Sequence, residues 1–117
     1  MIAEVNAEAI AVLGREGDIF HGAPTAIFIS ADKASDWAKL DSGIAVQNIA
    51  LAAHSMGLGS VILGLPLAAF KGARAAHFEK LLQFPATHEF AVAIAIGCPD
   101  GTKEAHPVKD GLVDYVR

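Results

Sequence analysis

Residues 41–64 read DSGIAVQNIALAAHSMGLGSVILG and predict a long helix, a glycine stop and a strand. Apolar side chains fall on nearly every face of the helix, which we expect to run from near Asp36 to Met56. About 20 helical residues span roughly 30 Å, enough to cross a small domain. A helix that is apolar nearly all round must be enclosed by other elements or by a second subunit.

Gly57 is expected to adopt the left-handed conformation that ends this helix, with Leu58 folding back over Ala53. The apolar, β-branched run at residues 60–63 predicts a strand buried on both faces. The glycines of residues 57–60 do not read as a phosphate-binding loop. Such a loop follows a strand and opens a helix, whereas here the order is reversed.

The rest of the chain alternates between helical and extended patterns. We expect a mixed α+β layer fold, with a small sheet of at least three strands packed on the long central helix. The remaining expected elements are a helix over residues 1–14, a strand over 25–29, a turn at 64–66, a helix from about 73 to 84, a strand over 89–97, and a short strand or extended arm over 108–117. Residues 1–117 are expected to form a single domain.

Two finer expectations concern caps and faces. Asp32 or Ser35 could accept hydrogen bonds from the first N–H groups of the central helix, and the sequence does not decide between them. The strand at residues 89–97 is apolar on both sides, as a central strand should be. Its large side chains are expected on one side and its alanines on the other: Phe90, Val92, Ile94 and Ile96 against Ala91, Ala93 and Ala95.

Composition narrows the function classes. The chain has 117 residues, a formal net charge of −4 and no basic run, which argues against nucleic acid as a partner. No apolar stretch is long enough to span a membrane, and no secretory signal is visible. Cys98 is the only cysteine, which fits a reducing compartment, so the cytoplasm is the expected location. The apolar share of 53 % favours a subunit interface, although alanine contributes much of it.

The sequence motifs give little support for a metal site or for a nucleophilic cysteine or serine. The five histidines are scattered, with no pair at helical spacing and no histidine–cysteine cluster, so no metal site is expected. His54 is read as a structural or interfacial residue. Cys98 follows a strand without a nearby basic motif and is expected to be inert. No serine lies in a GxSxG context.

The pattern DxGxAxQNxxLAAxxxGLGS, followed by an apolar strand ending in Gly64, resembles the central helix and following strand of the FMN-dependent nitroreductase family. The resemblance extends more weakly upstream to His21 and downstream to the C-terminus, roughly residues 20–117. It implies a nitroreductase-like domain that lacks the N-terminal part of the usual one. It also implies a homodimer packed through the central helix, with each flavin in the subunit interface.

The resemblance further implies where the flavin would lie. Ile62, Leu63 and Gly64 match the segment beside the flavin ring, and backbone N–H groups of Leu63 and Gly64 would approach the reactive N5 edge. Gly64 would let the main chain come close. Lys109 matches a basic residue that meets the flavin phosphate, although a solvated lysine explains its position as well. The implied reaction passes hydride from NAD(P)H through FMN to a nitroaromatic, quinone or similar acceptor, and it requires no side-chain acid or base.

A second hypothesis stays open beside the enzyme. The Arg-Ser-x-Arg pattern with which this family usually grips the flavin has no counterpart here, because Arg15 is the only arginine before Arg74. A non-catalytic nitroreductase-like domain that dimerises without flavin would account for that. A third reading is a binder of another small ligand in an apolar interface cleft. The sequence names neither the electron acceptor nor the nicotinamide donor.

Overall fold

The computed structural model describes residues 1–114 and 116. It contains a three-stranded antiparallel sheet in the order β1-β3-β2, so the last strand in the chain lies at the centre. The elements in chain order are α1 (Ile2–Leu13), β1 (Thr25–Asp32), α2 (Ala38–Ser55), β2 (Gly59–Leu63), the 3-10 helix η1 (Leu65–Ala68), α3 (Ala75–Leu81) and β3 (His88–Gly97).

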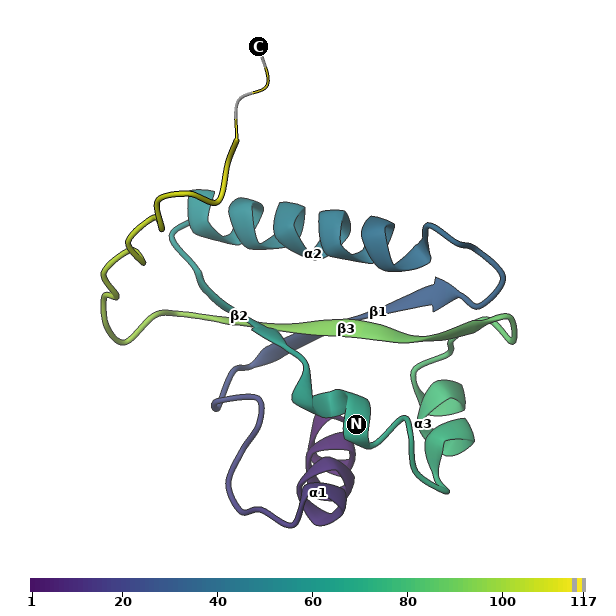
Figure 1. The fold of residues 1–117 in the computed structure, drawn as a ribbon. Helices are drawn as coiled ribbons and strands as arrows, with labels where there is room; N and C mark the ends of the chain where they lie inside the picture. The colour runs from purple at the N-terminus through teal and green to yellow at the C-terminus, as the bar shows by residue number, and fades with distance from the viewer. Residues whose placement is uncertain (115, 117) are drawn as a thin grey trace.

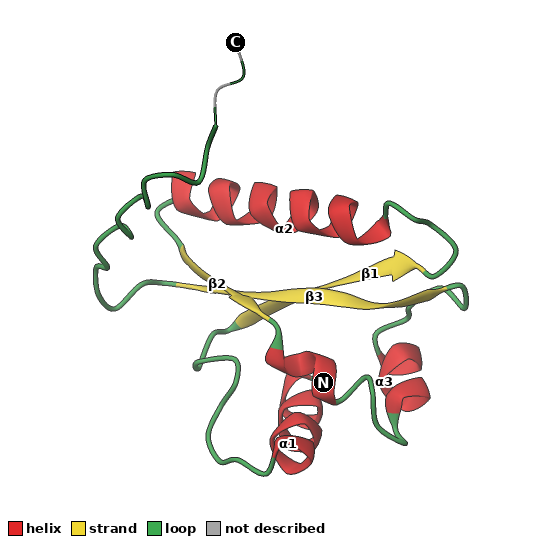
Figure 2. Ribbon diagram, viewed as in Figure 1, coloured by secondary structure: helices red, strands yellow, loops and turns green. Residues whose placement is uncertain are grey.

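The elements stack in three layers. Helix α2 runs along one face of the sheet, and α1, η1 and α3 cover the other face (Figure 1). Figure 2 shows the same division, with a single long helix above the strands and the shorter helices below. The predicted α+β fold, with a small sheet packed on a long central helix, is confirmed.

Helix α2 ends as the sequence predicts. Gly57 has φ of 75°, and its N–H donates to the carbonyl of His54 at 3.0 Å. The N–H of Leu58 donates to the carbonyl of Ala53 at 2.9 Å, which completes a Schellman motif. The helix begins at Ala38, close to the expected start near Asp36, but it has no side-chain cap, so the expected cap from Asp32 or Ser35 is wrong.

The two residues considered as caps serve the preceding turn instead. Asp32 is the last residue of β1, and its Oδ1 accepts a hydrogen bond from the N–H of Ala34 at 3.0 Å. The Oγ of Ser35 accepts one from the N–H of Trp37 at 3.3 Å, just before the helix. Both side chains therefore stabilise the connection from β1 to α2 rather than the first turn of α2.

Replacing Gly57 with alanine should destabilise the protein. A Cβ at a φ of 75° is strained even though no atom lies within 4 Å of it, and the cost is about 1 kcal/mol of unfolding free energy. Urea unfolding followed by circular dichroism measures this loss. The Gly101→Ala variant is the control, because Gly101 is equally open and lies outside the left-handed region. Equal stability of the two variants would contradict the assigned role of Gly57.

Strand β2 is an edge strand, so the prediction that it is buried on both faces is wrong. Leu63 is buried, but Ser60, Val61 and Ile62 are exposed. The physical reason is its place in the sheet: within the described residues β2 pairs only with β3, so no strand lies beyond it to help bury its side chains. An apolar run alone does not distinguish a central strand from an apolar edge.

Strand β3 is central, as predicted, but its faces are not divided as expected. Ile29 pairs with Val92 and Ser30 pairs with Phe90, so Ala91 is an extra residue that forms a bulge. The bulge turns Phe90 to the side of Ala93 and Ala95, toward α1 and α3. The expectation that Phe90 lies on the same side as Ile94 is therefore wrong.

An aromatic cluster fills the lower layer. The rings of Phe70 and Phe90 are stacked at 4.5 Å with an interplanar angle of 5°. Phe28 from β1 lies 6.3 Å from Phe90, and Phe78 from α3 lies 6.1 Å from Phe70. Burying aromatic side chains supplies much of the stabilisation of a small domain, and these rings join β1, β3, η1 and α3 into one core.

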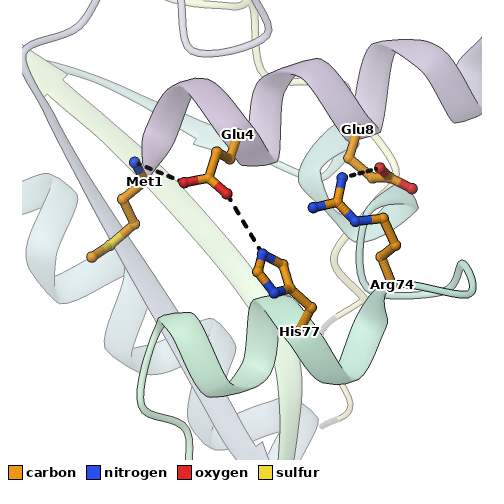
Figure 3. Close-up of polar contacts among 5 residues, drawn as sticks. All are labelled: Met1, Glu4, Glu8, Arg74 and His77. Atoms are coloured by element: carbon orange, nitrogen blue, oxygen red, sulfur yellow. Dashed lines mark hydrogen bonds and ion pairs between the residues drawn. The ribbon is translucent and has the colours of Figure 1, made fainter.

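Polar contacts between α1 and α3 flank this core (Figure 3). Nη1 of Arg74 donates to Oε2 of Glu8 at 3.0 Å, and the Arg74 guanidinium lies 5.0 Å from the centre of the Phe78 ring. Oε2 of Glu4 lies 3.5 Å from Nε2 of His77. These contacts are exposed and each contributes little, but they hold the two helices side by side.

The segments around α3 and after β3 differ from expectation. The expected turn at residues 64–66 is replaced in part by η1, and the expected helix from about 73 to 84 is only the seven residues of α3. The described residues after Gly97 contain no strand and form an exposed arm that leaves the body (Figure 1). The expected strand or arm over 108–117 is thus an arm, with residues 115 and 117 outside the described part.

Asp18 organises the connector between α1 and β1. Its carboxylate accepts hydrogen bonds from the N–H of Phe20 at 2.8 Å and the N–H of Gly22 at 2.6 Å. These two donors, that of Phe20 first, stabilise the ionised form and lower the pKa of Asp18 below its ordinary value, with a smaller contribution from His21. Partial desolvation opposes them.

The Asp18→Asn variant should therefore lose stability in a pH-dependent way. We expect a loss of about 1 kcal/mol at neutral pH, because solvent screens this exposed carboxylate. The stabilisation from a lowered pKa is complete above the unfolded-state pKa of about 4, and it disappears as the pH falls through the folded-state pKa. Urea unfolding of both proteins from about pH 7 to about pH 3 tests this. A difference that stays constant with pH would contradict it.

Candidate functional site

The end of β2 and the turn that follows it contain three of the four residues assigned to the site, which are Ile62, Leu63 and Gly64. Leu63 is buried in the lower core, so its side chain points into the protein and only its backbone is available to a ligand. Gly64 follows with φ of −93° and ψ of −26° and leads into η1, where Pro66 favours the first turn. A Cβ added at Gly64 would meet no atom within 4 Å, so the main chain here borders open space.

The backbone at this turn has hydrogen-bond donors to offer. The carbonyl of Gly64 accepts from the N–H of Leu67 at 3.1 Å, but within the described residues the N–H groups of Gly64 and Leu65 donate to no protein acceptor. The first N–H groups of a helical turn have no partner inside it. Two consecutive donors at this turn thus have no described protein partner, and they could bind an electron-rich atom of a ligand.

Ile62 precedes this turn on the exposed strand. It pairs with Ile94 in the ladder and is 49 % exposed. The structure therefore brings Ile62, Leu63 and Gly64 together at the open edge of the sheet, as their spacing in the sequence requires.

Lys109 lies elsewhere. It belongs to the exposed arm that starts after Gly97, and Gly97 pairs with Gly59 at the opposite end of β2 from Gly64. The arm runs away from the sheet past the C-terminal end of α2 (Figure 1). Within one subunit the structure does not bring Lys109 to Gly64.

An apolar groove adjoins the Gly64 turn and was not predicted. It has a volume of about 390 Å³ and lies between the C-terminal end of α1 and η1, where Val12 and Leu13 face Leu65 and Lys71. These positions are more than 50 residues apart in the sequence, and no motif links them. Only the packing of α1 against η1 reveals the groove.

A second cavity also combines residues that the sequence did not join. It has a volume of about 280 Å³ and lies between the sheet and the N-terminal part of α2. Here Ser30 Oγ lies 3.1 Å from Nδ1 of His88, and Asp32 and Asp41 line the same space. The cross-strand pairing of β1 with the start of β3 creates this contact, which sequence spacing cannot show.

Neither a metal centre nor a membrane helix is found in the part of the chain that the structure describes. No group of three or more histidine, cysteine, aspartate or glutamate side chains is close enough to hold a metal ion there. Among the same residues, no helix is both long and apolar enough to cross a bilayer.

Comparison with known proteins defines the class of this fold and site. The model of the nitroreductase family matches residues 3–98. An FMN-bound nitroreductase from Desulfitobacterium hafniense DCB-2 superimposes with a TM-score of 0.88 at 32 % identity, covering 99 % of this chain and 70 % of that one. An FMN-dependent nitroreductase from Clostridium difficile R20291 gives 0.76 at 26 % identity, covering 98 % of this chain and 71 % of that one.

A curated relative gives the same class. The NADPH-flavin oxidoreductase of Vibrio harveyi is 37 % identical over 87 residues, which cover 68 % of this chain and 33 % of that protein. The chain thus spans about a third of the length of this relative. The chain belongs to the nitroreductase family, and the resemblance read from the central helix and strand is confirmed. The family match begins at residue 3, upstream of the stretch on which the resemblance was based.

Proposed function

We propose that this chain is a flavin oxidoreductase that binds FMN as a homodimer and transfers electrons from NAD(P)H to a small-molecule acceptor. A nitroaromatic, a quinone or a similar compound is the acceptor class. The observation that carries this proposal is the open Gly64 turn, whose unpaired N–H groups lie at the end of the strand that follows the central helix. The FMN-bound state of similar structures supports it.

The residues at the turn fit a flavin ring. Leu63 and Gly64 would contribute backbone contacts, Ile62 an apolar side chain beside them, and no Cβ at Gly64 obstructs close approach. When bound, FMN supplies the electron transfer itself, accepting a hydride from NAD(P)H and passing two electrons to the acceptor. We assign no side chain as a catalytic acid or base. Lys109 is proposed as a phosphate contact, which requires the arm to move or a second subunit to supply it.

The outer face of α2 supports the homodimer. Ser42, Val46 and Ala53 face the sheet and are buried, so one subunit covers only one side of the helix. On the opposite side Leu40, Ile44 and Leu51 are 56 %, 53 % and 57 % exposed. A self-complementary interface between two copies of α2 would remove these side chains from water.

One experiment tests the proposal. Purified protein is incubated with FMN, and excess flavin is removed by gel filtration. Retained flavin absorbance, followed by oxidation of NADH or NADPH in the presence of a quinone, is the expected result. We also propose a cytoplasmic location, because the single described cysteine, Cys98, fits a reducing compartment. We further propose that residues 1–117 act as one domain.

The second candidate is a dimeric domain without flavin. The arm that carries Lys109 leaves the sheet at the end of β2 opposite Gly64, which favours this candidate, as does the absence of the Arg-Ser-x-Arg pattern from residues 1–117. Colourless protein that elutes as a dimer and takes up no FMN would establish this candidate and exclude the enzyme.

A further inference from the structure

The groove between α1 and η1 has the dimensions of a small-ligand site. Its volume of about 390 Å³ falls within the range of ligand pockets in proteins, about 300–1,000 Å³. Gly64 is one of its lining residues, so the groove continues directly from the backbone donors described above. The other lining residues are Val12, Leu13, Leu65, Leu67, Ala68, Lys71 and Gly72.

Apolar side chains that face water form the walls. Val12, Leu13 and Leu65 are each more than a third exposed in this subunit. Gly72 lies opposite Val12, since a Cβ there would be in ordinary van der Waals contact with Cγ2 of Val12 at 3.9 Å. A flat aromatic ring placed between these walls would remove apolar surface from water on both of its faces.

The charge on Lys71 favours a ligand that carries a negatively charged substituent. Lys71 is the one charged residue in the lining, and it forms no ion pair with any described residue. The carboxylate of Glu8 borders the groove, because a Cβ added at Gly72 would lie 3.8 Å from its Oε1, and its Oε2 is held by Arg74 at 3.0 Å (Figure 3). An anionic group on the ring could therefore pair with Lys71, while the ion pair with Arg74 reduces the repulsion from Glu8.

The cavity beneath α2 is lined by charges of the opposite sign. It is smaller, about 280 Å³, and Asp32 and Asp41 line it. Two carboxylates repel an anion, so a negatively charged aromatic compound should prefer the groove.

We propose that this groove binds the electron acceptor and favours aromatic acceptors that carry an anionic group, which Lys71 recognises. The inference rests on the proposed function, since it identifies the substrate class of that same site. The ring would lie between Val12 and Leu65, with its anionic group at Lys71 and its reducible group toward Gly64.

A matched pair of ligands tests the inference by binding alone. 4-Nitrobenzoate and 4-nitrobenzamide have nearly the same shape but differ in charge, and NMR titration measures their affinity for the chain with and without FMN. We expect the benzoate to bind about threefold to fivefold more tightly, the magnitude of a partly exposed ion pair. The Lys71→Gln variant should remove this preference, whereas Lys80→Gln, which changes a lysine outside the groove, should preserve it.

Kinetics of the FMN-loaded protein provide a second readout. Lys71→Gln should raise KM for 4-nitrobenzoate by the same factor and leave kcat unchanged. Equal affinities for the two ligands, a preference that survives Lys71→Gln, or chemical shift changes confined to another cavity would overturn the inference. Failure to take up FMN would instead refute the proposed function, and the binding comparison without FMN would still report on the groove by itself.

Discussion

A chain that carries both Ile44→Lys and Leu51→Lys is expected to elute as a monomer and to lose retained FMN. Both side chains lie on the outer face of α2 and are more than half exposed in one subunit. In the proposed dimer each lysine would place an unpaired ammonium group in an interface that excludes water, which costs several kcal/mol. We expect the dimer dissociation constant to rise at least about a hundredfold, and light scattering coupled to gel filtration measures it.

The matched control adds the same charge elsewhere. Ala7 and Ala11 are exposed alanines on α1, so Ala7→Lys with Ala11→Lys changes the net charge equally without touching α2. The control should remain dimeric and retain FMN. A dimer that survives the α2 substitutions would show that subunits meet through another surface. Loss of FMN from an intact dimer would show that FMN binding can be lost without loss of dimerisation.

Replacing Gly64 with valine should abolish or greatly weaken FMN binding while the fold remains. The backbone at Gly64 has a negative φ and a new side chain would meet no protein atom, so the structure accepts valine locally. The added methyl groups would instead occupy the open space beside the main chain of Gly64. Loss of a hydrogen bond and of close approach should weaken binding at least about tenfold.

Gly101→Val provides the comparison for Gly64→Val. Gly101 is also open and lies outside the left-handed region, but it belongs to the loop after β3. Fluorescence titration with FMN should give wild-type affinity for Gly101→Val and weakened affinity for Gly64→Val, with similar circular dichroism spectra for both. Unchanged flavin affinity in Gly64→Val would show that the ring does not lie at this turn.

The features predicted correctly are those set by local sequence. The Schellman ending at Gly57 follows from the need for a left-handed residue, which glycine meets without strain. The long helix and the central strand follow from the length and periodicity of their apolar residues. The open turn at Gly64 could be located because it directly follows β2 in the chain.

The features missed depend on tertiary packing. Residues 60–63 are apolar enough for a central strand, yet β2 lies at the edge because β3 takes the place between β1 and β2. The bulge at Ala91 turns Phe90 to the other face, and nothing in an alternating apolar run indicates an extra residue. The groove joins Val12 to Lys71, and only the fold brings α1 and η1 together. Lys109 lies on the arm after Gly97, and its contact with a flavin phosphate stays a prediction.

The mass and flavin content of the protein in a single gel-filtration peak test the central claim most directly. Light scattering gives the molecular mass of the peak, and absorbance gives its flavin content after incubation with FMN. We predict twice the mass of the 12.1 kDa chain and one FMN per subunit. A colourless peak, or a peak with the mass of one subunit, would contradict the proposal that two copies of α2 together complete a flavin site beside Gly64.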